Sequence, residues 1–255
     1  MSGSDEIPAL VRRLHAVAGW LRDDVRRWEA ARDRRAVFGF AYATITERIA
    51  EVLPTMGFDD TAWVVALDEA FAAEFRRAAD AVGPESAPPG WRPVLGALMR
   101  RRTSVFEDLV LGMVAHIVYD LPHALLAVEQ GAPDARHIRD FHRMNDLLAR
   151  GTGAIQDAVA RRYNPWLHWL DRLGGRLDEV LTDYGMRLAR GMAWYNAERL
   201  AAAAAAGDAG ATEESLARSV TKVVALALDP PAGVIGLGLR LLRLVASFGK
   251  RWPSS

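Results

Sequence analysis

The chain has 255 residues, in which 32 basic and 32 acidic side chains balance. This balance gives no electrostatic basis for binding nucleic acid or an anionic membrane surface. The absence of cysteine excludes disulfides, thiolate metal ligands and a cysteine nucleophile, and it fits a cytoplasmic protein. The polar segment 1–8 lacks the basic and apolar regions of a signal peptide, so none is expected.

Helical periodicity runs along the chain, and no convincing alternation typical of strands interrupts it. We therefore expect an all-α fold: a single-domain, irregular helical bundle over residues 1–206, with 207–255 as a C-terminal hairpin or appendage packed on it. The first helices are expected over 8–35, 37–53 and 60–82. In the third, Glu74 falls within the apolar face and is a candidate buried carboxylate. The proline-rich segment 83–93 is expected to be a loop.

A run of twenty almost entirely apolar residues, 109–128, predicts a central helix. Its length would suit a membrane span, but His116, Asp120, Pro122 and His123 interrupt it. A buried core helix is the better interpretation, and no transmembrane segment is expected. Because proline removes a backbone donor, a kink is expected at Pro122.

Further helices are expected over 134–150 and 177–206. The segment Gly151–Gly153 is expected to break the helix before it, and Thr212 is expected to cap the helix after 206. An aromatic segment begins after Asn164 and includes Trp166 and Trp169. The segment 234–248 is amphipathic and is expected to cover the core, with peripheral membrane contact as the alternative. The apolar stripe of the long helix is expected to comprise Val180, Leu181, Tyr184, Leu188, Met192 and Tyr195.

The central helix also carries the main candidate site. His116, Asp120 and His123 follow one another at i, i+4 and i+7, so an α-helix would stack them on one face. Unpaired charges inside a protein cost several kcal/mol, so these groups must be paired, hydrogen-bonded or bound to metal. We predict His116 and Asp120 as catalytic residues, which either form an acid–base pair or, together with His123, bind a divalent metal ion. The structural alternative is that Asp120 only holds His116 and caps the kink.

The helix expected over 134–150 would face this site. On its apolar side, His142 and Asn145 are predicted to supply further catalytic polar groups. The alternative for His142 is a core histidine with satisfied hydrogen bonds. Asp140 is expected on a solvated face, because ideal helix geometry turns it away from Asn145.

The segment Gly112-Met-Val-Ala-His-Ile-Val-Tyr-Asp-Leu-Pro122 resembles the signature Gly-Met-x-Ala-His-Ile-x-x-Asp-Leu-Pro of an uncharacterised, mostly bacterial, all-helical family. The resemblance covers about residues 36–206 and implies a helical fold, but no activity. Two departures, Val118 for asparagine and Gly191 for glutamate, imply an altered or depleted site. The recurring positions that it carries over are His116, Asp120, Asp140, Asn145, Arg190 and Trp194.

Together these features predict a small-molecule enzyme with a buried His/Asp cluster. It would act on a hydrophobic metabolite by hydrolysis or by isomerisation or cyclisation, in secondary metabolism. Apart from the divalent metal ion, no organic cofactor is indicated, and a homo-oligomer is left open. The alternative is a non-catalytic helical protein, derived from such an enzyme, that binds a ligand or a partner.

Overall fold

The computed structural model describes residues 3–100, 103–164 and 183–229. Across these ranges the chain forms helices joined by turns and contains no strand, which confirms the predicted all-α class. The expectations for the aromatic segment after Asn164, for residues 177–182 and for the amphipathic segment 234–248 lie outside the described residues.

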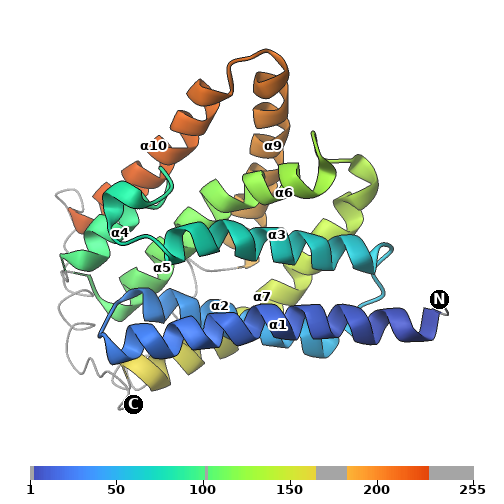
Figure 1. Cartoon of the computed structure of the whole chain (residues 1–255), viewed down its shortest axis with the longest axis horizontal. Helices are drawn as coiled ribbons and strands as arrows, with labels where there is room; N and C mark the ends of the chain where they lie inside the picture. Colours follow the sequence, from blue (N-terminus) through green and yellow to red (C-terminus); the bar gives the residue numbers. More distant parts are fainter. Residues whose placement is uncertain (1–2, 101–102, 165–182, 230–255) are drawn as a thin grey trace.

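The first two helices, α1 (Gly3–Ala30) and α2 (Arg35–Val52), lie side by side, and the N-terminal part of α1 extends beyond α2 (Figure 1). The turn between them places Arg32 in the left-handed region, with a φ of 53°. Helix α2 matches the expected range 37–53 within two residues, whereas α1 begins five residues before Pro8, which it contains, and ends five residues before the expected boundary at residue 35. Leu21, Val25 and Trp28 of α1 and Val37 of α2 belong to one buried apolar cluster.

The third helix, α3 (Thr61–Ala79), packs against α1 and α6. Its N-terminus is capped by Asp60, whose carboxylate accepts a hydrogen bond of 2.8 Å from the Trp63 backbone N–H. Glu74 is half-buried and paired with Arg77 on the same helix, so it is not the buried carboxylate that was expected. The following loop contains a 3₁₀ turn, η2 (Pro84–Ser86), and ends at a short helix, α4 (Arg92–Met99).

The central helix has three parts: α5 (Val105–Ala115), a π-helical turn η3 (His116–Asp120) and α6 (Leu121–Glu129). It begins with a capping box, in which Ser104 and Glu107 each accept a hydrogen bond from the other's backbone N–H. The combined helix is long and apolar enough to cross a membrane, and 61% of its most apolar window is buried inside the described structure. That burial matches a core helix, with Leu111 and Leu121 wholly inaccessible.

The next helix is longer than expected. After a 3₁₀ turn, η4 (Ala135–His137), helix α7 runs from Ile138 to Tyr163 without a break. The predicted interruption at Gly151–Gly153 is therefore wrong. Two glycines cost a helix roughly 1 kcal/mol each, and burial of Ile155, Val159 and Tyr163 in the following turns offsets this cost.

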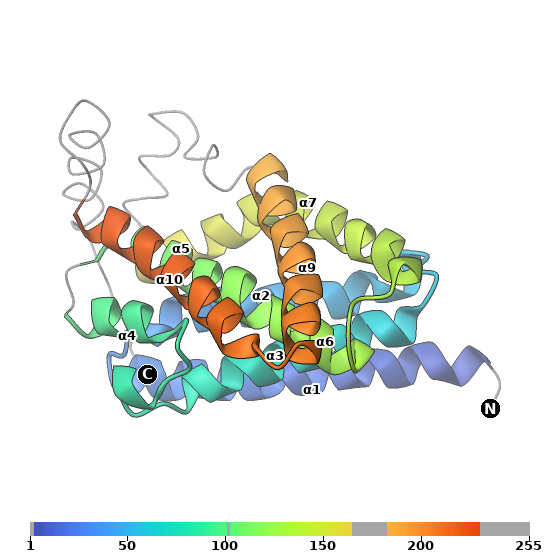
Figure 2. The same cartoon turned by 90° about the horizontal axis from the view of Figure 1, so that it is seen from above.

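The last described helices, α9 (Asp183–Ala205) and α10 (Ala209–Leu228), form a hairpin (Figures 1 and 2). Helix α9 packs on α6 and α7, whereas α10 packs on α4, α5 and η3. Asp208 occupies the N-cap position of α10, so the prediction that Thr212 caps this helix is wrong by four residues.

The apolar stripe expected on α9 faces outward. Leu188, Met192 and Tyr195 are 55%, 49% and 53% exposed. The buried face instead combines small, aromatic and charged residues. The pattern of large apolar residues in the sequence therefore did not predict which face of α9 is buried. It comprises Met186, Arg190, Ala193, Trp194, Ala197 and Leu200.

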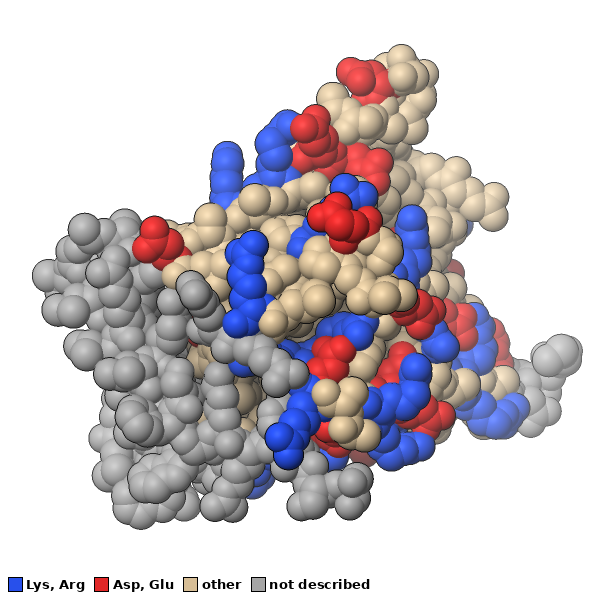
Figure 3. Space-filling model, turned by 60° about the vertical axis from the view of Figure 1, so that its left-hand side comes forward, with Lys and Arg blue, Asp and Glu red and all other residues tan. Residues whose placement is uncertain are grey.

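On the face of the molecule in Figure 3, acidic and basic side chains are interspersed and neither sign dominates. Many surface charges of the protein form ion pairs within one helix, such as Arg48 with Glu51 and Arg218 with Glu214. Exposed pairs of this kind contribute little to stability.

Candidate functional site

The π-helical turn places the two main candidate residues in the core. In this turn the Leu121 backbone N–H donates to the carbonyl of His116, five residues earlier. Pro122 follows and cannot donate a backbone hydrogen bond, and its ring would clash with the carbonyl of Val118 in a regular α-helix. A wider turn relieves this conflict. Such π turns are rare and concentrate at functional sites.

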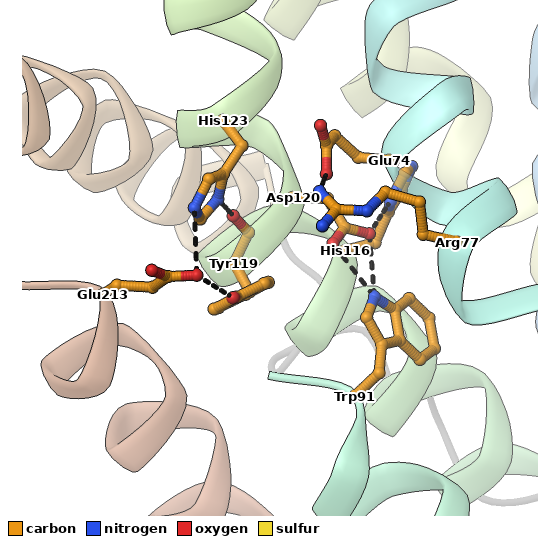
Figure 4. A network of polar contacts seen from close by, with 8 residues as sticks. All are labelled: Glu74, Arg77, Trp91, His116, Tyr119, Asp120, His123 and Glu213. Carbon is orange, nitrogen blue, oxygen red and sulfur yellow. Dashed lines mark hydrogen bonds and ion pairs between the residues drawn. The ribbon is translucent and has the colours of Figure 1, made fainter. Parts of the chain in front are cut away.

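His116 and Asp120 form a buried pair within this turn (Figure 4). The Nδ1 atom of His116 lies 2.8 Å from Oδ2 of Asp120, and the two residues are 4% and 0% exposed. Trp91, from the loop before α4, directs its indole N–H at both carboxylate oxygens, at 3.0 and 2.9 Å. The predicted pairing of these two residues is therefore present, with Trp91 as a third member.

Four aromatic rings surround the imidazole of His116. The Phe71 ring is stacked on it, with centroids 3.5 Å apart and planes 6° apart. The Tyr42 ring is tilted at 4.5 Å, and Phe38 and Phe75 approach edge-on. This packing fixes the orientation of the imidazole. It also removes water, which strengthens every electrostatic interaction the ring makes.

Burial disfavours the charged form of each partner. It lowers the pKa of His116 well below its ordinary value, and the nearby charge of Arg190 lowers it further. Burial also raises the pKa of Asp120 well above its ordinary value, which the hydrogen bond from Trp91 partly opposes. His116 is therefore neutral at pH 7, and one of its ring nitrogens can accept a proton.

A cavity of about 90 Å³ adjoins the imidazole. One water needs roughly 10–15 Å³, so the space suits a small ligand. His116 lines this cavity, whereas Asp120 does not. With Nδ1 held by Asp120, Nε2 is the nitrogen left for a ligand, and it is buried without a hydrogen-bond partner among the described residues. The wall is otherwise mainly apolar, with Phe38, Phe71, Leu109, Met113, Ile155 and Met186.

A second cavity of about 50 Å³ shares part of this wall, including Tyr42, Phe71 and Arg190. Asp68 of α3 also lines it and is 7% exposed. Burial raises the pKa of Asp68 to about 7, with Glu69 adding to the effect and Arg190 opposing it. Arg190 is 4% exposed, and burial lowers its pKa to about 10, so it remains charged at neutral pH.

Several buried polar atoms at these cavities lack a hydrogen-bond partner within the described residues. Besides His116 Nε2, they are the hydroxyl of Tyr42, Oδ2 of Asp68 and Nε2 of Gln156. Buried polar atoms are nearly always paired, so a group of unpaired ones around a void marks a place for water or ligand. This convergence defines the candidate site.

His123 lies apart from this site. Its Nδ1 is 2.6 Å from the carbonyl of Tyr119, and its Nε2 is 3.9 Å from Glu213 of α10 (Figure 4). The π turn explains this position, because it acts as an insertion of one residue and rotates all later residues by ~100°. The stacking of three groups expected from α-helical spacing is therefore restricted to His116 and Asp120.

The side chains do not fit the predicted metal site. Within residues 3–100, 103–164 and 183–229, no three His, Asp or Glu side chains come together as a metal would require. Asp120 already accepts hydrogen bonds from Trp91 and interacts with His116, so it has no oxygen directed at a shared centre. The geometry of His116 and Asp120 is that of a hydrogen-bonded acid–base pair and not that of two metal ligands.

The residues predicted on the facing helix separate into different environments. His142 is exposed on α7 rather than on its apolar side, and its Nδ1 is 3.4 Å from the side-chain amide nitrogen of Asn145. Asn145 is buried and accepts a hydrogen bond from Nε of Arg190. It therefore positions Arg190 and does not itself line either cavity.

Asp140 is buried, contrary to the expectation of a solvated face. Its two oxygens accept hydrogen bonds of 2.9 and 2.7 Å from the backbone N–H groups of Asp59 and Asp60. It thus fixes the turn that starts α3. Trp194 packs edge-on against Phe141, with ring centroids 5.0 Å apart.

Three residues of the site were missed by sequence reasoning. Trp91 lay in an expected loop, and no periodic pattern connects it to Asp120. Tyr42 resembled an ordinary core aromatic. Asp68 carried a usable signal, because Val64, Phe71 and Phe75 flank it at helical spacing and are apolar.

The two departures from the family signature lie outside the cavity walls. Val118 is half-buried and Gly191 is exposed, and neither lines either cavity. A side chain added at Gly191 would meet open space. These positions therefore give no reason to regard the cavity as depleted.

The fold and the cavity define a class: an all-helical protein whose central helix presents a buried histidine, paired with an aspartate, to a mainly apolar cavity. The chain belongs to a family of unknown function, DUF5995, whose sequence profile matches residues 14–230. Neither the comparison with curated proteins nor that with solved structures found a match.

Proposed function

We propose that this protein is a small-molecule enzyme in which His116 moves a proton on a hydrophobic substrate. The observation that carries the proposal is the position of His116 Nε2, which is buried and unpartnered at the wall of an apolar cavity. The other ring nitrogen is held by Asp120. With Nδ1–H donating to the carboxylate of Asp120, a neutral imidazole presents the lone pair of Nε2 to the cavity, which is the geometry of a general base.

Asp120 and Trp91 act as positioning residues. When Nε2 takes a proton, the positive charge on His116 is balanced by the adjacent carboxylate, so no isolated charge is created in the core. The indole N–H of Trp91 stabilises the ionised form of Asp120. The same pair then returns the proton to another atom of the substrate.

This geometry favours isomerisation or cyclisation over hydrolysis. In either reaction the proton leaves one substrate atom for Nε2 and returns to a second, so no water is consumed. The apolar side chains of Phe38, Phe71 and Met113 line the cavity. They suit such chemistry because they exclude water from the reacting atoms. Hydrolysis would require a water placed beside Nε2 and remains the second reaction class.

Non-catalytic binding of a small hydrophobic molecule is the alternative function. The preformed cavity supports it equally, because an enclosed apolar space with a few polar groups is typical of ligand sites in general. The two functions differ in one respect: only the enzyme depends on the basicity of His116.

The proposal can be tested with 5-nitrobenzisoxazole, a small neutral aromatic whose isoxazole ring opens when a base removes the one proton on that ring. As the C–H electrons form the nitrile, the N–O bond breaks and the oxygen leaves as a coloured phenolate. We expect the purified protein to accelerate this reaction above free imidazole at equal concentration. Removal of a general base costs about 10²–10⁴-fold, so His116→Gln should abolish the acceleration.

The matched control is His142→Gln, which removes an exposed imidazole outside both cavities. Its rate should equal that of the wild type, and Asp120→Asn should fall between the wild type and His116→Gln. A wild-type rate no higher than that of free imidazole, or an undiminished rate in His116→Gln, would refute the proposed function.

A further inference from the structure

Arg190 carries a buried charge that the protein pairs only in part. Its Nε donates to Asn145, and its guanidinium lies over the Phe141 ring at 4.5 Å. Within the described residues, no other hydrogen bond of this side chain is found, and the residue is 4% exposed. Arg190 lines both cavities, so its guanidinium is within reach of a ligand that enters either one.

Two further polar groups border this space. The Tyr42 hydroxyl and Asp68 Oδ2 are buried and have no hydrogen-bond partner among the residues described, and no ion pair there joins Asp68 to Arg190. A buried guanidinium with unused donors costs several kcal/mol unless something completes it. A bound group with acceptor oxygens would do so.

We propose that Arg190 binds the carboxylate of a small, otherwise apolar carboxylic acid, whose hydrocarbon part occupies the cavity beside His116. The planar guanidinium presents two parallel N–H donors that match the two oxygens of a carboxylate. Tyr42 can donate a third hydrogen bond from its hydroxyl. This inference rests on the proposed function, because it names the substrate class for the same cavity.

The charges favour a monoanion. Arg190 is the one Lys or Arg among the described residues that line the two cavities, so a phosphate dianion would retain uncompensated charge in the core. Above about pH 7, the ionised carboxylate of Asp68 adds negative charge nearby and further disfavours a dianion. The apolar wall near His116 then selects a hydrocarbon or aromatic body over a second polar group.

Binding of this anion would also prepare His116 for proton transfer. The positive charge of Arg190 contributes to the lowered pKa of His116. A bound carboxylate would neutralise that charge and make the imidazole a stronger base. Substrate binding and base strength would thus be coupled through Arg190.

The inference is tested by calorimetric titration of the full chain with benzoate and with benzyl alcohol, a neutral probe of similar shape. We expect benzoate to bind about tenfold or more tightly than benzyl alcohol, since hydrogen bonds to charged groups are the stronger ones. Arg190→Gln should lose this preference. Arg199→Gln, which removes an exposed arginine from the same helix, is the matched control and should keep it.

Asp68→Asn provides a second test with the opposite sign. At pH 8, above the pKa of Asp68, this substitution removes a negative charge near Arg190, so it should strengthen benzoate binding severalfold and leave benzyl alcohol binding unaffected. Equal affinity of the wild type for the two probes, or a retained preference in Arg190→Gln that melts like the wild type, would overturn the inference. Should Arg190→Gln fail to fold, the Asp68→Asn variant decides: benzoate binding that is unchanged or weaker than that of the wild type would overturn the inference.

The two proposals fail separately. His116→Gln leaves Arg190 in place and should still prefer benzoate over benzyl alcohol, although it should not catalyse ring opening. If the wild type catalyses ring opening but binds benzoate no more tightly than benzyl alcohol, only the carboxylate inference is refuted. Retained anion preference without catalysis refutes the enzyme and leaves a carboxylate-binding protein.

Discussion

Replacement of Asp68 by asparagine should change how the stability of the protein depends on pH. Asp68 is 7% exposed, and burial raises its pKa from 3.8 to about 7. In the unfolded chain the carboxyl ionises near pH 3.8, whereas in the folded protein it stays protonated until about pH 7. Unfolding therefore releases a proton between these values, and the free energy of unfolding falls as pH rises through this window.

The size of the effect follows from the displacement of the pKa. Each unit corresponds to 1.36 kcal/mol, so the full displacement of about three units amounts to roughly 4 kcal/mol. Of this, about 2.5 kcal/mol falls between pH 5 and pH 8. Asparagine is neutral throughout, so the stability of Asp68→Asn relative to the wild type should rise by that amount over this range.

The measurement is urea denaturation of both proteins at several pH values from 5 to 8. Other titrating groups, such as His116 and Asp120, are common to both proteins and cancel in the difference. Asp80→Asn, an exposed carboxylate at the end of the same helix, is the control and should follow the wild type closely. A difference between Asp68→Asn and wild type that stays constant with pH would show that Asp68 ionises normally and would refute the reasoning.

Three further substitutions test the packing around the site by urea denaturation. Gly112→Ala would place a Cβ 2.5 Å from Cγ of Phe38, so it should destabilise the protein by about 1–3 kcal/mol, and an unchanged midpoint would contradict this close approach. Asp140→Ala removes the acceptor of two backbone N–H groups and should cost roughly 2–3 kcal/mol; a loss below ~0.5 kcal/mol would show that water replaces it freely. Met192→Gln lies on the exposed face of α9 and should stay within about 0.5 kcal/mol of wild type, unless that face is covered in solution.

The sequence by itself determined the fold class and the core of the site. Helical periodicity sufficed for an all-α protein, and the polar residues that interrupt the apolar run favoured a buried central helix over a membrane span. His116 and Asp120 were predictable because an i, i+4 spacing survives in either an α or a π turn, and because polar groups in an apolar helix require compensation. Local chemistry along one helix was enough for these conclusions.

Only the tertiary structure decided which other residues join them. A single π turn rotated His123 away, and the packing of α9 buried Arg190 while it exposed Leu188 and Met192. Trp91 reached Asp120 from a loop, across a distance in sequence that no periodic pattern encodes. The physical reason is that periodicity assigns residues to faces of one helix, whereas the partner of each face is set by how all the helices pack together.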